Sequence, residues 1–244
     1  MSRFWVRDNM TSSKRFVDQY DVILLDLMDT LMFGGNRFSE EQDYAQTYRR
    51  LGGKYHSDRE VQWVIHQVYE TMSEHYADPA YHENFRPAST YLIETLDALG
   101  LPQTDAARLH NVFAHHELGH VPDGHCQALQ QLAKTHRLGL VSNLWSEKAL
   151  FVRAFRRCHI HHLFDTLVFS SDHSLIKPSP KLFQKALDQF DTPTHRVLFV
   201  GDSPERDMAT AEALGMGTLL VTATGETTYP GRKAVDICAL LDRL

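Results

Sequence analysis

Five short apolar runs constrain the fold of this chain more than any other feature of its sequence. Each run is followed by polar residues or glycine, and segments with the spacing of amphipathic helices separate the last four. Runs of this kind are typical of parallel strands buried on both faces, and their alternation with helices is typical of a doubly wound sheet. We therefore predict an α/β fold with strands at residues 22–25, 138–141, 166–169, 197–200 and 218–221, and helices at 148–158, 180–190 and 206–214.

A long insertion separates the first apolar run from the second. It covers roughly a hundred residues and contains four stretches with helical spacing, at 39–51, 58–76, 88–99 and 105–117. We predict a Rossmann-like core formed by residues 1–33 and 122–244, with a mainly helical cap inserted at 34–121. The tail, 234–244, is expected to form an edge strand that runs into a helix.

The composition is that of an ordinary globular protein. Hydrophobic residues make up 43% of the chain and charged residues 23%, and the net charge of −6 is not gathered in a tail. This balance favours neither a nucleic-acid partner nor an anionic membrane surface. The three cysteines form no C-x-x-C pair, residues 1–20 contain no sustained apolar stretch, and no run of about 18 apolar residues occurs. We expect a cytoplasmic protein without a membrane partner, whose oligomeric state the sequence leaves open.

Carboxylates follow two of the predicted strands, where an open parallel sheet places its ligand crevice. Asp26 and Asp29 come directly after the first strand, in Asp-Leu-Met-Asp-Thr-Leu, while Asp202 follows the fourth strand and Asp207 lies shortly beyond it. Aspartates are also common in turns and at helix starts, so a structural reading of each stretch stays open. Acids gathered at one crevice repel each other unless a cation joins them, and their oxygens suit Mg²⁺. The pattern favours a magnesium site.

Two further stretches supply groups that could bind phosphate beside these acids. Ser142 and Asn143 end the second strand and offer a hydroxyl, backbone N–H groups and an amide to phosphoryl oxygens. Lys177 begins Lys-Pro-Ser-Pro-Lys-Leu-Phe, where prolines stiffen the loop and can start a helix. A lone lysine is usually a solvated surface charge, but one held in a rigid loop after a strand is well placed to neutralise a dianion.

These four stretches, in this order, resemble motifs I to IV of the haloacid dehalogenase superfamily of aspartate-nucleophile phosphohydrolases. The resemblance covers residues 20–32 and about 122–222, and the lysine loop and Gly-Asp-Ser-Pro-Glu-Arg-Asp are its most specific parts. It implies a cap that closes over the crevice, excludes water and selects the substrate. It also implies a Mg²⁺-dependent phosphatase acting on a small phosphorylated metabolite.

The resemblance implies a role for each matching residue. Asp26 would attack phosphorus and form an aspartyl-phosphate. Ser142, Asn143 and Lys177 would hold the phosphoryl group during its transfer, with Lys177 counted among the catalytic groups.

The metal site carries a departure from the family pattern. By resemblance, Asp26 and Asp202 would bind Mg²⁺ with the backbone carbonyl of Met28, and Asp207 would bind it directly or through water. Met28 stands where family phosphatases carry a second Asp, and the spacing of the following residues excludes a shift of register, so we expect Asp29 to point elsewhere. The missing acid would protonate the leaving group and later activate water, a contribution of about 10²- to 10⁴-fold.

Three interpretations of Met28 stay open. The protein is a slow phosphatase of substrates with good leaving groups, a hydrolase of phosphonates or carbon–halogen bonds, or a noncatalytic phosphate-binding protein. By resemblance, the haloacid type dispenses with the metal and alters motif IV. The intact Asp202 and Asp207 therefore argue against dehalogenation.

Residues 116–120 fit the H-E-x-x-H signature of zinc metalloproteases, with His125 as a candidate third ligand. That signature works only on a continuous helix, and Gly119 and Pro122 indicate that the helix ends here. We expect this His-rich junction to bind zinc or nickel adventitiously at most. Loss of His116 or Glu117 should accordingly leave phosphohydrolase activity nearly unchanged.

The identity of the substrate lies beyond the sequence. The insertion offers polar side chains to the crevice, but periodicity does not show which of them face it. Solvated surface is the simpler expectation for each of these groups, which are Arg37, Lys54, Tyr81 and Arg86.

Overall fold

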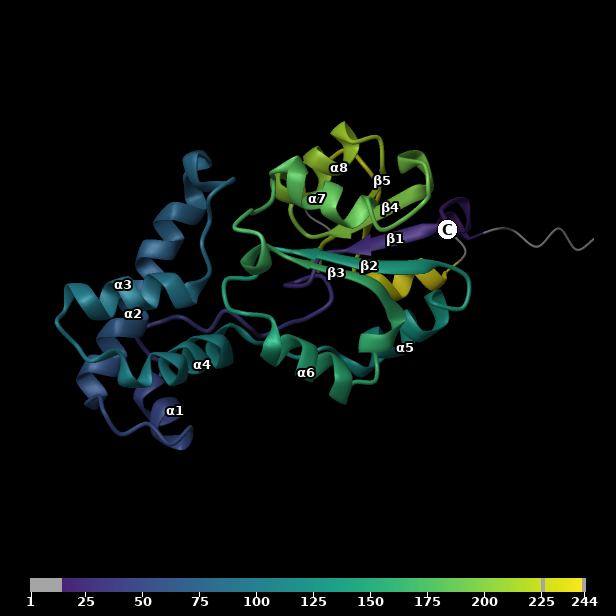
Figure 1. Ribbon diagram of the computed structural model, residues 1–244. Coiled ribbons are helices and arrows are strands. Elements are labelled where there is room, and N and C mark those ends of the chain that lie inside the picture. Colours follow the sequence, from purple (N-terminus) through teal and green to yellow (C-terminus); the bar gives the residue numbers. More distant parts are fainter. Residues whose placement is uncertain (1–14, 225–226, 243–244) are drawn as a thin grey trace, which may run out of the picture.

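The protein is built around a parallel sheet of six strands, seen in a computed structural model that describes residues 15–224 and 227–242 (Figure 1). The strands are β1 (Val22–Leu25), β2 (Arg137–Ser142), β3 (Phe164–Phe169), β4 (Val197–Gly201), β5 (Gly217–Val221) and β6 (Lys233–Ala234). Their order is β3-β2-β1-β4-β5-β6. The predicted α/β fold is confirmed, and each predicted strand is present with bounds that differ by no more than two residues.

The central strand β1 aligns the segments that carry the motifs. In the register of the sheet, Leu25 lies opposite Leu140 of β2 on one side and opposite Val200 of β4 on the other. The carboxyl ends of these three parallel strands therefore meet at one edge of the sheet. Residues that follow them in sequence are brought together there.

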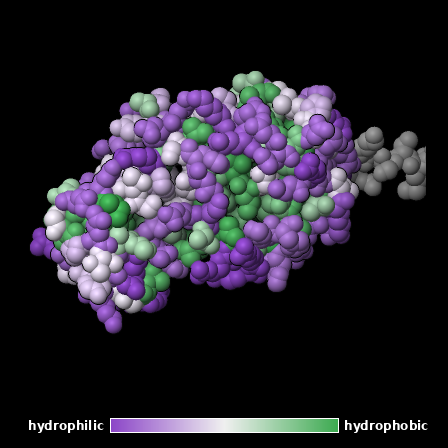
Figure 2. Space-filling model, viewed as in Figure 1, coloured by the Kyte–Doolittle hydropathy of each residue, from purple (hydrophilic) through white to green (hydrophobic). Residues whose placement is uncertain are grey.

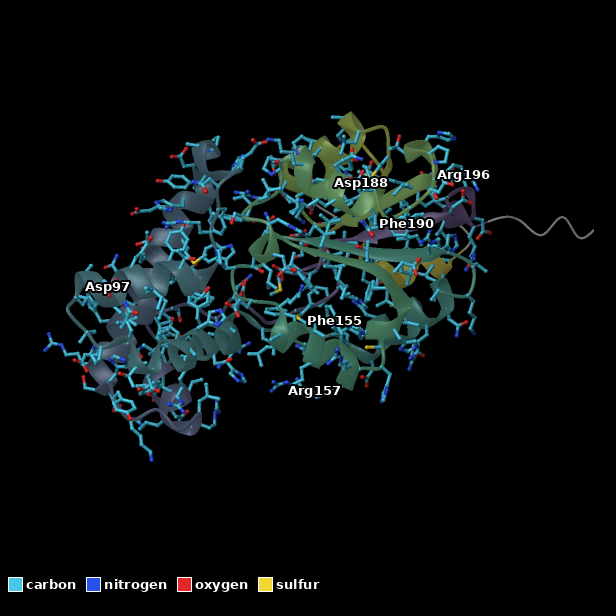
Figure 3. The ribbon with its side chains drawn as sticks, in the orientation of Figure 1. Asp97, Phe155, Arg157, Asp188, Phe190 and Arg196 are labelled. Carbon is cyan, nitrogen blue, oxygen red and sulfur yellow. The ribbon has the colours of Figure 1, made fainter. Side chains whose placement is uncertain are left out.

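Helices cover both faces of the sheet. Ile23 and Leu25 pack in one apolar cluster with α5 (Asp123–Leu132) and α6 (Ala149–Arg157), and Phe155 belongs to it. Val22 and Leu24 pack in a second apolar cluster with α7 (Pro180–Leu187) and α8 (Ala209–Ala213), and Phe190 belongs to this second cluster (Figure 3). Because both faces are covered, all four residues of β1 are fully buried, which explains its uninterrupted apolar sequence.

The insertion folds into helices with an apolar cluster of their own, drawn to the left of the sheet in Figure 1. They are α1 (Tyr44–Arg50), α2 (Asp58–Ala77), α3 (Ala88–Ala98) and α4 (Ala106–Glu117). The longest begins at a capping box in which Ser57 and Glu60 satisfy each other's backbone N–H groups. The mainly helical insertion is confirmed, while its division from the core at 33/34 and 121/122 stays a prediction.

Some predicted helices differ in detail. The first begins at Tyr44 and is capped by Asp43, whose side chain accepts from the N–H of Gln46, so residues 39–43 lie outside it. The predicted helix at 206–214 is a π-helical turn, η7 (Pro204–Met208), followed by the short α8. The tail forms the two-residue β6 and a 3₁₀ helix, η8 (Ile237–Leu241), while residues 243–244 lie outside the described part.

Hydrophilic side chains cover most of the face drawn in Figure 2, with apolar ones showing between them. Across the described residues, no helix combines the length and the apolarity that a membrane crossing needs. Residues 1–14, on which the expectation about the N-terminal segment largely rests, lie outside the described residues.

Candidate active site

Lys177 bridges two carboxylates at the edge of the sheet. Asp26 follows β1 directly, and its N–H donates to the carbonyl of Val200 (2.8 Å). The Lys177 Nζ lies 2.5 Å from Oδ1 of Asp26 and 2.6 Å from Oδ1 of Asp207, and all three side chains are buried. Burial alone lowers the pKa of Lys177, but the two carboxylates outweigh burial and raise this pKa, so the ammonium stays charged.

The third acid of the cluster is Asp202. Asp26, Asp202 and Asp207 each bring a carboxylate oxygen to within 4.8 Å of the other two. Because three acids meet one ammonium, negative charge is in excess: burial, together with Asp26 and Asp207, raises the pKa of Asp202 to about 7. A divalent cation would supply the missing charge, and carboxylate oxygens are the ligands that Mg²⁺ prefers. The side chains present therefore fit the predicted magnesium ion.

Replacing Asp202 with Asn should stabilise the metal-free protein at pH 8. The folded-state pKa lies above the usual value, so the folded protein holds this proton more tightly than the unfolded chain, and stability is lost as the pH rises from 3.8 to about 7. We expect the variant to gain about 1–2 kcal/mol in unfolding free energy in EDTA, which is part of the ~4 kcal/mol that a rise from 3.8 to about 7 represents at ~1.4 kcal/mol per pKa unit. Urea denaturation would measure it, and the gain should shrink between pH 8 and pH 4. A gain that grows on acidification would contradict this account.

Ser142 and Asn143 differ in what they contact. The Ser142 hydroxyl is buried and has no hydrogen-bond partner within the described residues, so a phosphoryl oxygen would satisfy it. Asn143 is already engaged: its Oδ1 accepts from the N–H of Lys177 (2.7 Å), and its Nδ2 donates to the Lys177 carbonyl (3.2 Å) and to the hydroxyl of Tyr76 (3.1 Å). These contacts fix the backbone of Lys177. A direct contact of Asn143 with phosphate stays a prediction.

Asp207 is held against the backbone of Gly201. Its Oδ2 accepts from the N–H of Ser203 (3.1 Å), at the start of the π-helical turn η7. A methyl group added at Gly201 would lie 2.9 Å from the Cβ of Asp207 and closer still to its carboxylate. Only glycine therefore lets Asp207 reach Lys177.

Replacing Gly201 with Ala should displace Asp207 and lower kcat by about 10²-fold, because shifts near 1 Å at a reacting centre have effects of this size. The measurement is steady-state hydrolysis in Mg²⁺, with Gly124→Ala as the control, since a methyl group there meets only an ordinary contact at 3.8 Å. Unchanged kcat in Gly201→Ala would show that the position of Asp207 is not critical.

Met28 and Asp29 both line the cavity above the acids. Asp29 adopts a left-handed backbone (φ 56°), which is uncommon for a residue other than glycine, and its N–H donates to the carbonyl of Met32 (2.8 Å). Its charge contributes to the raised pKa of Asp202. Asp29 therefore lines the cavity without joining the three converging carboxylates, and the prediction that its side chain points elsewhere stays a prediction.

The cavity has a volume of about 420 Å³. Four of its lining residues form an aromatic wall: Phe38, Tyr69, Tyr76 and Trp145. Phe38 stacks on Tyr69 with ring centroids 4.7 Å apart, and Trp145 lies 5.4 Å from Tyr76. Sequence reasoning missed these residues, although one signal was present: Tyr69, Ser73 and Tyr76 lie on one face of α2 at i, i+4 and i+7. The four polar groups considered from the sequence, Arg37, Lys54, Tyr81 and Arg86, do not line this cavity.

Arg206 was also missed, and it connects the helical region to the lysine loop. It donates to the carbonyls of Lys177 (2.8 Å) and Tyr76 (2.9 Å). Its guanidinium lies 3.8 Å from the centre of the Tyr76 ring, a cation–π contact. This residue therefore holds the aromatic wall in place beside the acids.

The H-E-x-x-H segment does not form a metalloprotease site. Helix α4 ends at Glu117, so His116 and His120 do not share a helix face, and His116 instead contacts the hydroxyl of Thr47 (3.1 Å). No metal-capable cluster of the described chain contains this histidine pair. Burial lowers the pKa of His116 to about 4, which keeps its ring neutral at pH 7.

Glu117 was not among the residues predicted to line the site. It lines the cavity, and its two oxygens accept from the N–H groups of Trp145 (2.7 Å) and Ser146 (2.8 Å) in the loop that follows β2. Burial raises the pKa of this carboxyl. The expectation that loss of Glu117 leaves phosphohydrolase activity nearly unchanged stays a prediction.

The sequence of this chain is similar to those of known hydrolases. The profile of haloacid dehalogenase-like hydrolases matches residues 62–221. The chain is 30% identical over 149 residues to a glyceraldehyde 3-phosphate phosphatase of Pyrococcus abyssi, covering 57% of this chain and 58% of that protein. It is 32% identical over 101 residues to the pyrimidine 5′-nucleotidase YjjG of Escherichia coli, covering 41% of this chain and 44% of that protein. The chain thus spans about half the length of the curated relatives it matches.

Solved structures show the same fold. A 2-haloacid dehalogenase from Pseudomonas syringae superposes with a TM-score of 0.65 at 20% identity, covering 91% of this chain and 96% of that one. The HAD-hydrolase YfnB of Bacillus subtilis, bound to magnesium, superposes with a TM-score of 0.54 at 17% identity, covering 92% and 96%. The matched family profile extends over most of the chain and includes β2 and β4, while β1 and Asp26 lie before its first matched residue. The chain belongs to the haloacid dehalogenase-like hydrolase family.

Proposed function

We propose that this protein is a Mg²⁺-dependent phosphatase that transfers the phosphoryl group of a small phosphate ester to Asp26. The observation that carries the proposal is the contact of Asp26 with the buried ammonium of Lys177, beside an acid cluster that fits a divalent cation. The relatives named as phosphatases of glyceraldehyde 3-phosphate and of pyrimidine nucleotides support a small phosphorylated substrate. The magnesium in YfnB supports the choice of metal.

The side chains divide the work of phosphoryl transfer. Lys177 contacts one oxygen of Asp26, and the other oxygen attacks phosphorus as the bond to the leaving oxygen breaks. The free hydroxyl of Ser142 donates to the phosphoryl group in flight, while Lys177 balances its charge. Magnesium, when bound, would neutralise further negative charge at the nucleophile and the phosphoryl oxygens. Water then releases phosphate from Asp26.

The organic part of the substrate is proposed to be flat and apolar. The aromatic wall suits such a group, because aromatic rings bind one another through offset stacks and edge contacts. The methionine at position 28 also favours an aryl phosphate as substrate. An aryl oxide leaves without a proton, so its departure does not need the missing acid. Aryl phosphates therefore match both the wall and the departure at position 28.

Replacing Tyr69 with Ala should raise KM for aryl phosphates by about 10-fold, the equivalent of ~1.4 kcal/mol of lost ring contact. Acetyl phosphate has a good leaving group but no ring, so its KM should stay the same. Tyr55→Ala, at a tyrosine that is 61% exposed and outside the cavity, is the control variant. Equal effects on both substrates would exclude ring recognition by Tyr69.

The proposed activity is tested by a hydrolysis screen over phosphate monoesters, phosphonates and haloacids, in Mg²⁺ and in EDTA, with Asp26→Asn as the blank. We expect phosphate release from monoesters that requires both Mg²⁺ and Asp26. Turnover confined to phosphonates or haloacids would replace the proposal with one of the other chemistries, and phosphate binding without turnover would indicate a noncatalytic role.

A further inference from the structure

Three side chains of different chemistry meet at the C-terminal end of the chain, apart from the cavity. His125 lies on α5, and Asp236 and Cys238 lie at the start of η8. Each of the three brings a ligand atom to within 4.8 Å of the other two, and none lines the cavity. The two helices pack against each other, and Figure 1 draws the yellow C-terminal segment beside α5.

The imidazole of His125 is oriented before any ligand arrives. The side chain is buried, its Nδ1 lies 3.4 Å from the carbonyl oxygen of Leu31, and its ring meets that of Phe33 edge-on at 5.4 Å. A carbonyl at Nδ1 fixes the tautomer that leaves the lone pair on Nε2, which is the usual arrangement of a metal-binding histidine. The Nε2 lies 3.9 Å from Oδ2 of Asp236, too far for a hydrogen bond.

The other two groups are fixed in one turn. Oδ1 of Asp236 accepts from the N–H of Cys238 (2.8 Å), so the carboxylate caps η8 and holds its second oxygen near His125. Cys238 is a free, half-buried thiol. The turn thus presents an oxygen and a sulfur to one nitrogen.

We propose that His125, Asp236 and Cys238 bind Zn²⁺, with water as the fourth ligand. Nitrogen, thiolate and carboxylate are the ligand types of tetrahedral zinc, whereas Mg²⁺ prefers oxygen alone and fits the acid cluster instead. An ion pair between His125 and Asp236 is the other reading, but at 3.9 Å with a carboxylate that is 40% exposed it would contribute little. Zinc would tie the C-terminal turn to α5 and, through the carbonyl of Leu31, to the loop that follows Asp26.

The test uses untagged protein carrying Asp202→Asn, which weakens the acid cluster, stripped of metal and titrated with Zn²⁺ and then with Co²⁺. We expect one zinc per chain and, with cobalt, a thiolate-to-metal absorption band. Cys238→Ser should abolish the band and weaken zinc binding by more than about 100-fold, beyond the loss of an outer-sphere partner. Cys158→Ser, at another half-buried free thiol, should change neither.

Zinc uptake that is equal in Cys238→Ser and in its parent would overturn the proposal, as would the absence of uptake in a parent protein whose circular dichroism is native. His125→Gln is the second variant, since it keeps a polar side chain beside Phe33. Zinc binding that this variant retains would also overturn the proposal. Hydrolysis by the unmodified protein is measured separately, so failure of the phosphatase proposal leaves this test intact.

Discussion

Asp26→Asn is expected to lower kcat for phosphate esters by at least about 10⁴-fold, in line with the loss of a covalent nucleophile in other hydrolases. The amide keeps the size of the side chain but cannot attack phosphorus, and it removes one of the two carboxylates that hold Lys177. Steady-state hydrolysis of an aryl phosphate in Mg²⁺ measures the effect. Asp191→Asn serves as the control, because it removes one negative charge from an exposed residue that does not line the cavity.

Two outcomes would count against this assignment of Asp26. Activity that falls by less than about 10-fold would mean that another group is the nucleophile, because such a loss is far below that expected for a covalent step. Activity that survives Asp26→Asn but disappears in Glu117→Gln would assign the chemistry to Glu117, which lines the same cavity.

Met28→Asp is expected to raise turnover of alkyl phosphates by about 10²- to 10⁴-fold, the usual contribution of general acid–base catalysis. Aryl phosphates should change little in the first step, because their leaving group needs no proton. Met28 lines the cavity beside the acids, so the new carboxyl would face the substrate. The measurement compares both substrate classes in steady state and in single-turnover experiments.

Met28→Asn is the matched control, since it is polar and of similar size to Asp but transfers no proton. A wild-type protein already fast on alkyl phosphates would show that another acid has replaced the missing one, and Asp29 on the same wall would be examined first. Equal inactivity of wild type and Met28→Asp on every phosphate would point to different chemistry or to a binding role.

The sequence was sufficient to predict the sheet and the meeting of the acids. β1 and β4 are apolar and buried throughout, and β2 is buried from Leu138 onward. Parallel strands place their carboxyl ends together, so the residues that follow these strands had to converge. The convergence of Asp26 and Asp202 follows from this topology alone. The roles of these acids came from the resemblance to a family, not from the periodicity.

The details of the site were beyond sequence reasoning because they depend on contacts between distant segments. Glu117, the last residue of α4, accepts from the N–H of Trp145 in the loop after β2. Arg206 donates to the carbonyl of Tyr76, which lies 130 residues earlier in the chain. A π-helical turn that contains Asp207 replaces the start of a predicted α-helix, and the Asp207 carboxylate lies where a side chain at residue 201 would otherwise be. The left-handed backbone of Asp29 has only a weak signal in its residue type, because aspartate adopts this conformation more often than most residues but still uncommonly.

The most direct test of the central claim is to trap the covalent intermediate. The protein would be mixed with an aryl phosphate in Mg²⁺, quenched in acid within one turnover, and mapped by peptide mass spectrometry. We predict one phosphoryl group, found on the peptide that contains Asp26. The phosphoryl-enzyme should accumulate at early times, because with Met28 in place of an acid its hydrolysis lacks a general base. Phosphate release with no phosphoryl-enzyme at any time, or a phosphoryl group on another residue, would contradict the account.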